Sequence, residues 1–103
     1  MFLNLTGREY LQLVIKLYHQ ESQGSSHAIE ELSCTFKLEQ SLDDYIANYS
    51  LGMKQKTYLI AAFLSGARNL LLDEPFNGLD PESAAILKKM LIQSRDAGAM
   101  ILF

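Results

Sequence analysis

Two carboxylates directly follow a short apolar run in the second half of the chain. Residues 70–72 are three leucines with the character of a buried strand, and Asp73, Glu74 and Pro75 come next. At the carboxyl end of a parallel strand, the first acid can hold Mg²⁺ through water, and the second can orient or deprotonate a water that attacks a phosphate. The alternative is an ordinary strand end followed by a turn, and this run alone favours neither interpretation.

A second candidate site lies at the start of a predicted helix, in the segment YSLGMKQK of residues 49–56. The hydroxyl of Ser50 and the amides that Gly52 leaves accessible can bind an anion at a helix N-terminus, where the macrodipole favours negative charge. The simpler alternative is an N-cap serine with a glycine in the first turn, and the segment alone favours it. Lys54 and Lys56 either contact phosphate or, as is more common at helical spacing, form a solvated face.

A third candidate is the segment NGLDP of residues 77–81, with Asn77, Gly78 and Asp80. Taken alone, it is better explained as a turn followed by a helix cap. Asp80 can serve as the N-cap, and Pro81 then occupies the first helical position, where proline is favoured.

The elements that carry these segments predict an α/β fold. A strand over 70–73, a helix over 81–96 and a strand over 99–103 make a βαβ unit, which is typical of a parallel sheet. In this helix we expect Ile86 and Met90 to face the core, ahead of Leu87 and Leu91.

Three helices are predicted before this unit. The first starts at a capping box formed by Thr6 and Glu9 and runs to about His19. The second covers residues 27–38, and the third covers residues 51–64 with Ser50 as its N-cap.

Composition excludes several classes of protein. The chain has 103 residues, 49% of them hydrophobic, and a net charge of -3, which leaves room for one small domain and gives no basic surface for nucleic acid. Its single cysteine excludes an internal disulfide framework and fits a cytosol-type protein. Six acids against one base between Glu21 and Asp44 indicate a solvated helical face, with an interaction surface as the less common alternative.

Together and in this order, the three segments resemble motifs of the ATP-binding subunit of ABC transporters. Residues 49–56 are similar to the signature motif, commonly LSGGQ, in a variant typical of bacterial export-type members. Residues 70–75 resemble Walker B with its adjoining catalytic glutamate, and residues 77–80 resemble the D-loop. The stretch of residues 5–9 is similar to the opening of the helical subdomain in that family.

The resemblance implies a partial P-loop NTPase fold of the ABC ATPase type. A helical subdomain segment would cover residues 1–48, and the signature motif with its helix would cover 49–66. Residues 67–103 would form the Walker B and D-loop part of the ATPase core, with the βαβ piece of its parallel sheet.

The resemblance also implies the catalytic chemistry, with ATP and Mg²⁺ as cofactors. Asp73 would help to hold Mg²⁺ through water, and Glu74 would be the catalytic residue that polarises the attacking water.

The other matching residues would act between subunits that pack head to tail. Ser50 and Gly52 would contact the γ-phosphate of an ATP held mainly by the second ATP-binding subunit. Asn77, Gly78 and Asp80 would communicate across the dimer interface. The further implied partners are transmembrane permease subunits, which place the protein in the cytoplasm at the inner face of the cell membrane.

Departures from the family pattern suggest that this is a fragment. No G-x-x-x-x-G-K-[ST] motif occurs, and the chain stops inside the apolar run of residues 100–103. Leu51 and Met53 replace the usual first glycine and the glutamine of the signature. We therefore expect the chain to be inactive alone and to hydrolyse ATP only as part of a complete subunit; the alternative is a truncated, non-enzymatic chain that binds a partner through its helices.

Overall fold

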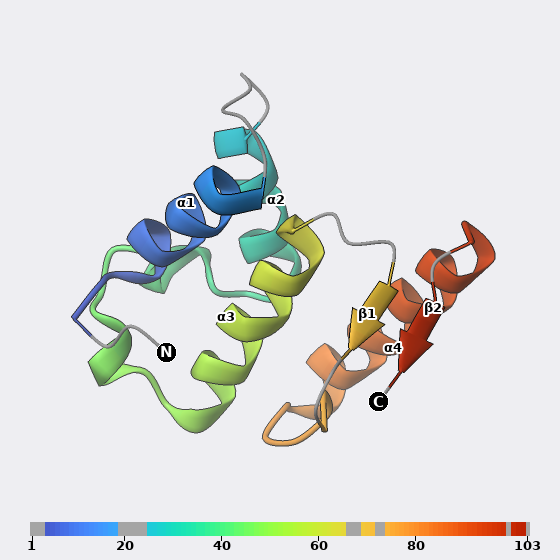
Figure 1. Ribbon diagram of the computed structural model, residues 1–103. Coiled ribbons are helices and arrows are strands. Elements are labelled where there is room, and N and C mark those ends of the chain that lie inside the picture. Colours follow the sequence, from blue (N-terminus) through green and yellow to red (C-terminus); the bar gives the residue numbers. More distant parts are fainter. Residues whose placement is uncertain (1–3, 19–24, 66–68, 72–73, 99, 103) are drawn as a thin grey trace.

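The computed structural model describes residues 4–18, 25–65, 69–71, 74–98 and 100–102. Within these ranges, helices make up the first part of the chain, and two short strands flank a last helix (Figure 1). The α-helices are α1 (Gly7–Tyr18), α2 (Ser25–Thr35), α3 (Leu51–Leu64) and α4 (Pro81–Asp96), the 3-10 helices are η1 (Glu39–Ser41) and η2 (Ile46–Asn48), and the strands are β1 (Asn69–Leu71) and β2 (Met100–Leu102).

Helix α1 begins with a reciprocal cap. Thr6 Oγ1 accepts the backbone N–H of Glu9 at 3.1 Å, and the backbone N–H of Thr6 donates to Glu9 Oε1 at 2.9 Å. The predicted capping box is therefore confirmed. Thr6 also forms an isolated antiparallel bridge with Tyr45, which joins the start of α1 to the segment just before η2.

Helix α2 differs from the predicted helix at both ends, because it starts at Ser25 and ends at Thr35. At its end, the backbone N–H of Leu38 donates to the carbonyl of Ser33 at 2.7 Å, and Lys37 has a left-handed φ of 59°. This is the Schellman pattern, in which the residue after the helix turns the chain away. The prediction of a helix to residue 38 was wrong because a lysine occupies the position where a glycine usually marks the end.

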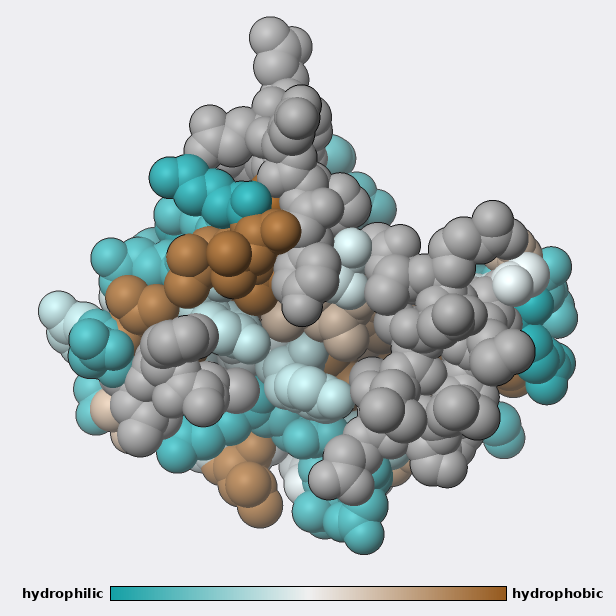
Figure 2. All heavy atoms as spheres, in the orientation of Figure 1, coloured by the Kyte–Doolittle hydropathy of each residue, from teal (hydrophilic) through white to brown (hydrophobic). Residues whose placement is uncertain are grey.

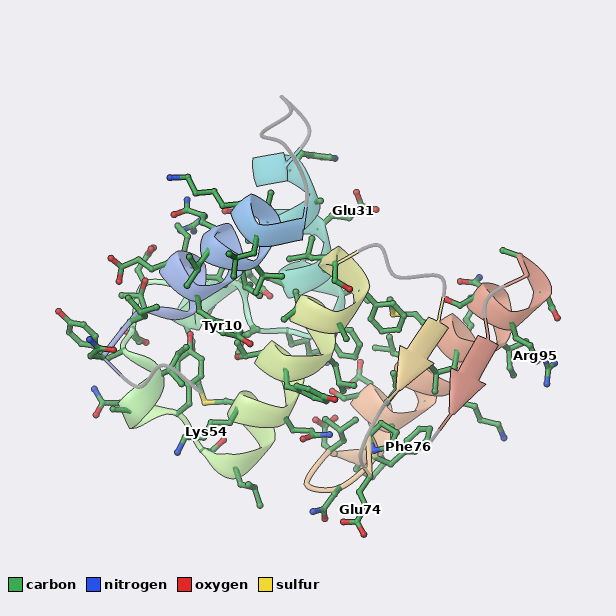
Figure 3. The ribbon with its side chains drawn as sticks, in the orientation of Figure 1. Tyr10, Glu31, Lys54, Glu74, Phe76 and Arg95 are labelled. Atoms are coloured by element: carbon green, nitrogen blue, oxygen red, sulfur yellow. The ribbon has the colours of Figure 1, made fainter. Side chains whose placement is uncertain are left out.

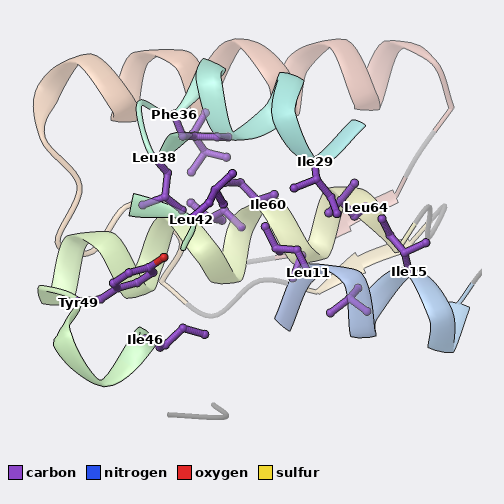
Figure 4. Packing of buried hydrophobic residues seen from close by; sticks show 14 of the residues in the cluster. Leu11, Ile15, Ile29, Phe36, Leu38, Leu42, Ile46, Tyr49, Ile60 and Leu64 are labelled. Atoms are coloured by element: carbon purple, nitrogen blue, oxygen red, sulfur yellow. The ribbon is translucent and has the colours of Figure 1, made fainter. Parts of the chain in front are cut away.

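The buried core comes mainly from the helices of residues 4–65. Helix α3 packs against both α1 and α2, and Figure 4 shows the buried side chains gathered around it. Tyr49, just before α3, is buried as well; its hydroxyl donates to the carbonyl of Ser41, and burial raises its pKa. Each large apolar side chain removed from water contributes about 1.5–3 kcal/mol. The fully or nearly fully buried apolar residues of this part are Leu11, Val14, Ile15, Ile29, Phe36, Leu38, Leu42, Ile46, Tyr49, Leu59, Ile60, Ala61 and Leu64.

Arg8 at the start of α1 pairs with two carboxylates of the acid-rich segment. Its Nε donates to Asp43 Oδ1 at 2.9 Å and its Nη1 donates to Glu30, and these bonds raise the pKa of Arg8. Solvent screens both pairs, because the two carboxylates are exposed. The other described acids between residues 30 and 44 are exposed too, so the predicted solvated face is confirmed for these residues.

The two strands pair in parallel. Leu70 lies opposite Ile101, and α4, which connects the strands in sequence, packs against β2 (Figure 1). Strand β1 begins one residue earlier than predicted, at Asn69. Residues 72, 73, 99 and 103 of the predicted strands lie outside the described residues.

Helix α4 has the predicted bounds but a different inward face. Its buried residues are Ser83, Leu87 and Leu91, which follow one another at intervals of four and so share one stripe of the helix. Ile86 and Met90 are only half-buried against the core. The expected order of burial was wrong because the face of α4 that meets the core is centred on Leu87 and Leu91, one position further along the chain than predicted.

The described helices include none with the length and apolar character of a membrane span. Figure 2 shows hydrophobic side chains exposed over α1, and Leu17 of this helix is 71% exposed.

Candidate functional site

The start of α3 meets the loop of residues 74–80, which leads into α4. The two backbones are so close that a Cβ added at Gly52 would lie 2.8 Å from the carbonyl oxygen of Gly78. Figure 3 shows Glu74 and Phe76 on this loop beside the start of α3. The segments of residues 49–56 and 77–81, together with Glu74, therefore lie at one corner of the molecule.

Ser50 caps α3 as predicted. Its Oγ accepts the backbone N–H of Met53 at 3.1 Å, and its hydroxyl proton can still be donated to a ligand. The N–H groups of Leu51 and Gly52 are in the first turn, where no intrahelical acceptor exists. Because the helix has 14 residues and Ser50 is exposed, this end can bind an anion by hydrogen bonds and by the helix dipole.

Glu74 has an unusual backbone conformation and an exposed side chain. Its φ is 44°, in the left-handed region that few residues other than glycine adopt. Its carbonyl accepts the N–H of Asn77 at 3.0 Å, which closes a turn at the end of the acid-containing segment. The carboxylate is thus presented to solvent from a tightly turned backbone.

Asn77 and Gly78 form the exposed tip of the loop. Gly78 has a φ of 80°, a conformation that favours glycine, although a Cβ there would make only ordinary contacts with Leu51 and Gly52. The predicted turn is confirmed by the Leu79 N–H, which donates to the carbonyl of Phe76 at 3.2 Å.

Asp80 is the N-cap of α4. Its Oδ2 accepts the backbone N–H of Ser83 at 3.0 Å, and its Oδ1 accepts the Ser83 hydroxyl at 2.9 Å. These bonds, with a smaller contribution from Lys56, lower the pKa of the Asp80 carboxyl to about 2. Asp80 is therefore ionised at neutral pH and fixed to its own helix.

Two residues of α3 connect this helix to the loop, and their roles were not predicted. Gln55 Nε2 donates to the carbonyls of Pro75 at 2.9 Å and Glu74 at 3.3 Å. Lys56 Nζ lies 3.4 Å from Asp80 Oδ1 and its side chain is only 14% exposed, so the interpretation of Lys56 as part of a solvated face was wrong. The available signal was spacing, because residues 55 and 56 follow Gly52 by three and four positions and so lie on its side of the helix.

Six of the seven predicted site residues are described, and all six lie at this corner: Ser50, Gly52, Glu74, Asn77, Gly78 and Asp80. The predicted Mg²⁺ ligand, Asp73, lies outside the described residues. Among the described residues, no three or more His, Cys, Asp or Glu side chains gather in a way that could hold a metal ion. Mg²⁺ at nucleotide sites usually takes only one or two carboxylates, with phosphate and water as its other ligands, so a single acid is compatible with such a site.

Comparison with known proteins identifies the family. Residues 1–77 match the family model described as ABC transporter. The "Uncharacterized ABC transporter ATP-binding protein YthP" of Bacillus subtilis (strain 168) is 39% identical over 98 residues, which are 95% of this chain and 42% of the relative. The "Bacitracin transport ATP-binding protein BcrA" of Enterococcus faecalis is 38% identical over 89 residues, or 85% of this chain and 28% of that protein.

The structure agrees with the sequence relatives. A solved structure, "Structure of ATP binding subunit of ABC transporter", superposes with a TM-score of 0.91 at 33% identity and covers 99% of this chain and 42% of that one. The chain thus spans less than half the length of these proteins, and its fold is that of a part of an ABC ATPase. By sequence and by structure, the chain belongs to the ABC transporter family.

Proposed function

We propose that this chain is part of an ATP-binding subunit that couples ATP binding and hydrolysis to transport across a membrane. The observation that carries the proposal is the contact between Gly52 and Gly78, which brings the capped start of α3 and the acid-bearing loop to one surface in a member of the ABC transporter family. The names of its relatives, among them a bacitracin transport ATP-binding protein, support it.

Under this proposal, the chain divides into three parts. Residues 1–48 are a segment of the helical subdomain, and residues 49–66 are the signature motif and its helix. Residues 67–103 are the Walker B and D-loop part of the core. Strands β1 and β2, with α4 as the helix that connects them, are the βαβ piece of its parallel sheet. The parallel pairing of β1 with β2 supports this division.

Ser50 and Gly52 would bind the γ-phosphate of an ATP that a second subunit holds. The support is the geometry of the α3 start, where Ser50 is exposed and the first-turn amides of Leu51 and Gly52 have no acceptor within the helix. A phosphate there would also gain from the helix dipole.

Glu74 would orient the water that attacks the γ-phosphate, and Asp73 would hold Mg²⁺ through water. The bound ion would neutralise charge on the phosphates. The exposed carboxylate of Glu74, presented from a turned backbone, fits a group that must reach a ligand outside this chain.

Asn77, Gly78 and Asp80 would face the second subunit of a head-to-tail dimer. Asn77 and Gly78 are exposed at the tip of the loop beside Ser50, so a partner that contacts one segment would also contact the other.

The further proposed partners are transmembrane permease subunits at the inner face of the membrane, with no role for nucleic acid. The exposed apolar side chain of Leu17 on α1 is one surface that such a partner could cover.

The test is ATP hydrolysis by a complete ATP-binding subunit that contains this chain. We expect Glu74→Gln to lower kcat by about a hundred-fold or more while ATP still binds, because a neutral amide neither polarises the attacking water as a carboxylate does nor accepts its proton. Glu39→Gln, at an exposed acid in η1, is the matched control. Turnover by Glu74→Gln equal to that of the control would refute the proposed role, as would a complete subunit that does not hydrolyse ATP.

A further inference from the structure

The backbone at Glu74 is held in a conformation that it would not adopt unaided. A φ of 44° brings the Cβ of a non-glycine residue close to its own backbone, so the conformation persists only where neighbouring groups stabilise it. One stabilising bond is local, from the N–H of Asn77 to the carbonyl of Glu74. It closes the turn but does not fix the turn relative to the rest of the site.

The second stabilising group comes from α3. The side-chain amide of Gln55 donates to the carbonyl of Pro75 at 2.9 Å and to the carbonyl of Glu74 at 3.3 Å. An amide nitrogen carries two protons, so one NH₂ group can serve both acceptors. Two consecutive carbonyls are thereby fixed to a helix that belongs to the other part of the chain.

Gln55 is well placed to transmit the position of the α3 start to this loop. It lies one turn after Gly52 and on the same side of the helix, and it is half-buried. The lack of a side chain at Gly52 lets the loop approach, and Gln55 then bonds to the carbonyls of the two peptides that flank Pro75.

We propose that Gln55 is a positioning residue, which holds the backbone of Glu74 so that its carboxylate points toward the attacking water. The inference rests on the proposed function, in which Glu74 acts in ATP hydrolysis. It adds that the turn of Glu74 is set from the signature helix of the same chain, through a side chain that acts on the backbone of Glu74 and Pro75.

Two other contacts between α3 and the loop do not involve Gln55. They allow the positioning role of Gln55 to be tested separately from a role in holding the loop in place. The ion pair of Lys56 with Asp80 and the close packing of Gly52 on Gly78 do not depend on Gln55. Loss of the Gln55 bonds should therefore leave the loop attached and change chiefly the direction of Glu74. Turnover should respond far more than thermal stability.

The experiment compares Gln55→Glu and Gln55→Met in the complete subunit. Gln55→Glu keeps the shape but faces two carbonyl oxygens with a carboxylate that has no proton to donate, and Gln55→Met keeps the length without polar atoms. We expect kcat to fall by about ten-fold or more in both, with Gln55→Glu the lower, because a shift of about 1 Å in a catalytic group is enough for such losses. KM for ATP should stay within about two-fold of wild type, since nucleotide contacts are unchanged.

Gln40→Glu makes the same charge change at an exposed site in η1 and serves as the control. Melting temperatures of all variants are measured beside kcat. If Gln55→Glu does not fold, Gln55→Met decides the matter. A kcat within about two-fold of wild type in Gln55→Met, or a loss of activity that only follows a loss of folded protein, would overturn the positioning role. Failure of the proposed function is distinguishable, because it requires an inactive wild type or an active Glu74→Gln variant.

Discussion

The helical half of the molecule and the strand-containing half stabilise their elements in different ways. The helical half comprises the described residues between 4 and 65. Its buried side chains pack in one cluster and come from α1, α2, α3, η2 and the residues that flank η1. In the strand-containing half, Leu87 and Leu91 of α4 join the same buried apolar cluster. Helix α3 is therefore anchored by this core from Thr57 onward, whereas the 74–80 loop packs on it through Leu79 and is further positioned by specific contacts with the start of α3.

The candidate site lies on the boundary between these halves. Its proposed phosphate-binding end belongs to helix α3, and its exposed acid, Glu74, belongs to the loop. Contacts between described residues that join them include Gly52 with Gly78, Gln55 with two carbonyls, and Lys56 with Asp80. Small changes at this boundary should therefore affect activity more than changes of equal size elsewhere on the surface.

The strongest test of the boundary asks whether its two sides serve the same ATP molecule. In the head-to-tail dimer that we propose, Glu74 acts on the ATP bound by its own subunit, and Ser50 acts on the ATP of the partner. A dimer of one wild-type subunit and one subunit with both Glu74→Gln and Ser50→Arg should lose both sites. With one substitution on each subunit, both lesions fall in one site, so the second site should keep turnover at up to about half the wild-type rate.

ATP hydrolysis by purified mixed dimers is the measurement, and dimers with Glu39→Gln on one subunit are the control. Equal and measurable turnover in the two arrangements would show that Ser50 does not act on the partner's nucleotide. Turnover in the dimer that carries both substitutions on one subunit, with none in the other arrangement, would mean that the two sides of the boundary serve the ATP of a single subunit.

The core of the helical half should respond most strongly in stability. Phe36 has no exposed surface, and Phe36→Ala removes a ring from the buried apolar cluster. We expect a loss of about 3–5 kcal/mol in the free energy of unfolding, measured by urea denaturation of the chain. Leu17→Ala, at a side chain that is 71% exposed, should change it by less than about 0.5 kcal/mol. Similar losses in both variants would mean that the helical half has no close-packed core.

Features governed by neighbouring residues were predictable from the sequence. The bounds of α3 and α4 follow from the N-caps Ser50 and Asp80 and from Pro81, because a cap bonds to an amide only three residues away. The capping box of Thr6 and Glu9 was predictable for the same reason.

Features that depend on distant partners were not predictable. The end of α2 at a left-handed Lys37 has no local signal, and the rotation of α4 depends on where the core lies. At the site, the family motifs in the sequence predicted the residues for which we propose phosphate binding and water activation. Gln55 bonds to carbonyls 19 and 20 residues away, so its contact required the folded structure.

A smaller effect is expected where the two halves touch. In an ordinary first helical turn, Gly52→Ala would stabilise the protein by about 0.5–1 kcal/mol. Here the new Cβ would lie 2.8 Å from the Gly78 carbonyl, which is backbone and cannot rotate away. We expect a net destabilisation of about 1–3 kcal/mol from the forced separation of α3 and the loop, again by urea denaturation. A stabilised Gly52→Ala variant would mean that the loop moves away freely and that the contact does not hold the boundary.

The smallest predicted effect is a pH dependence of stability. It tests whether contacts within α4 or a contact with the helical half control the ionisation of Asp80. Its pKa of about 2 in the folded protein lies below the ordinary 3.8, so the folded state favours the ionised carboxyl. The stability that this ionisation provides is present above about pH 4 and is lost as the pH falls toward about pH 2. Asp80→Asn still caps α4 but does not titrate. Wild type should therefore be the more stable protein near neutral pH, and the difference in unfolding free energy should shrink as the pH is lowered.

Lys56→Met then separates the two sources of the lowered pKa. The Ser83 bonds within α4 are the larger cause and Lys56 of α3 is a smaller one. In the Lys56→Met background, the difference between Asp80 and Asp80→Asn should therefore keep most of its pH dependence. Titration of the other acids cancels, because each comparison is between proteins that share them. If the pH dependence disappears with Lys56, the ionisation of Asp80 is governed by the helical half, and the boundary is held by charge rather than by packing at Gly52.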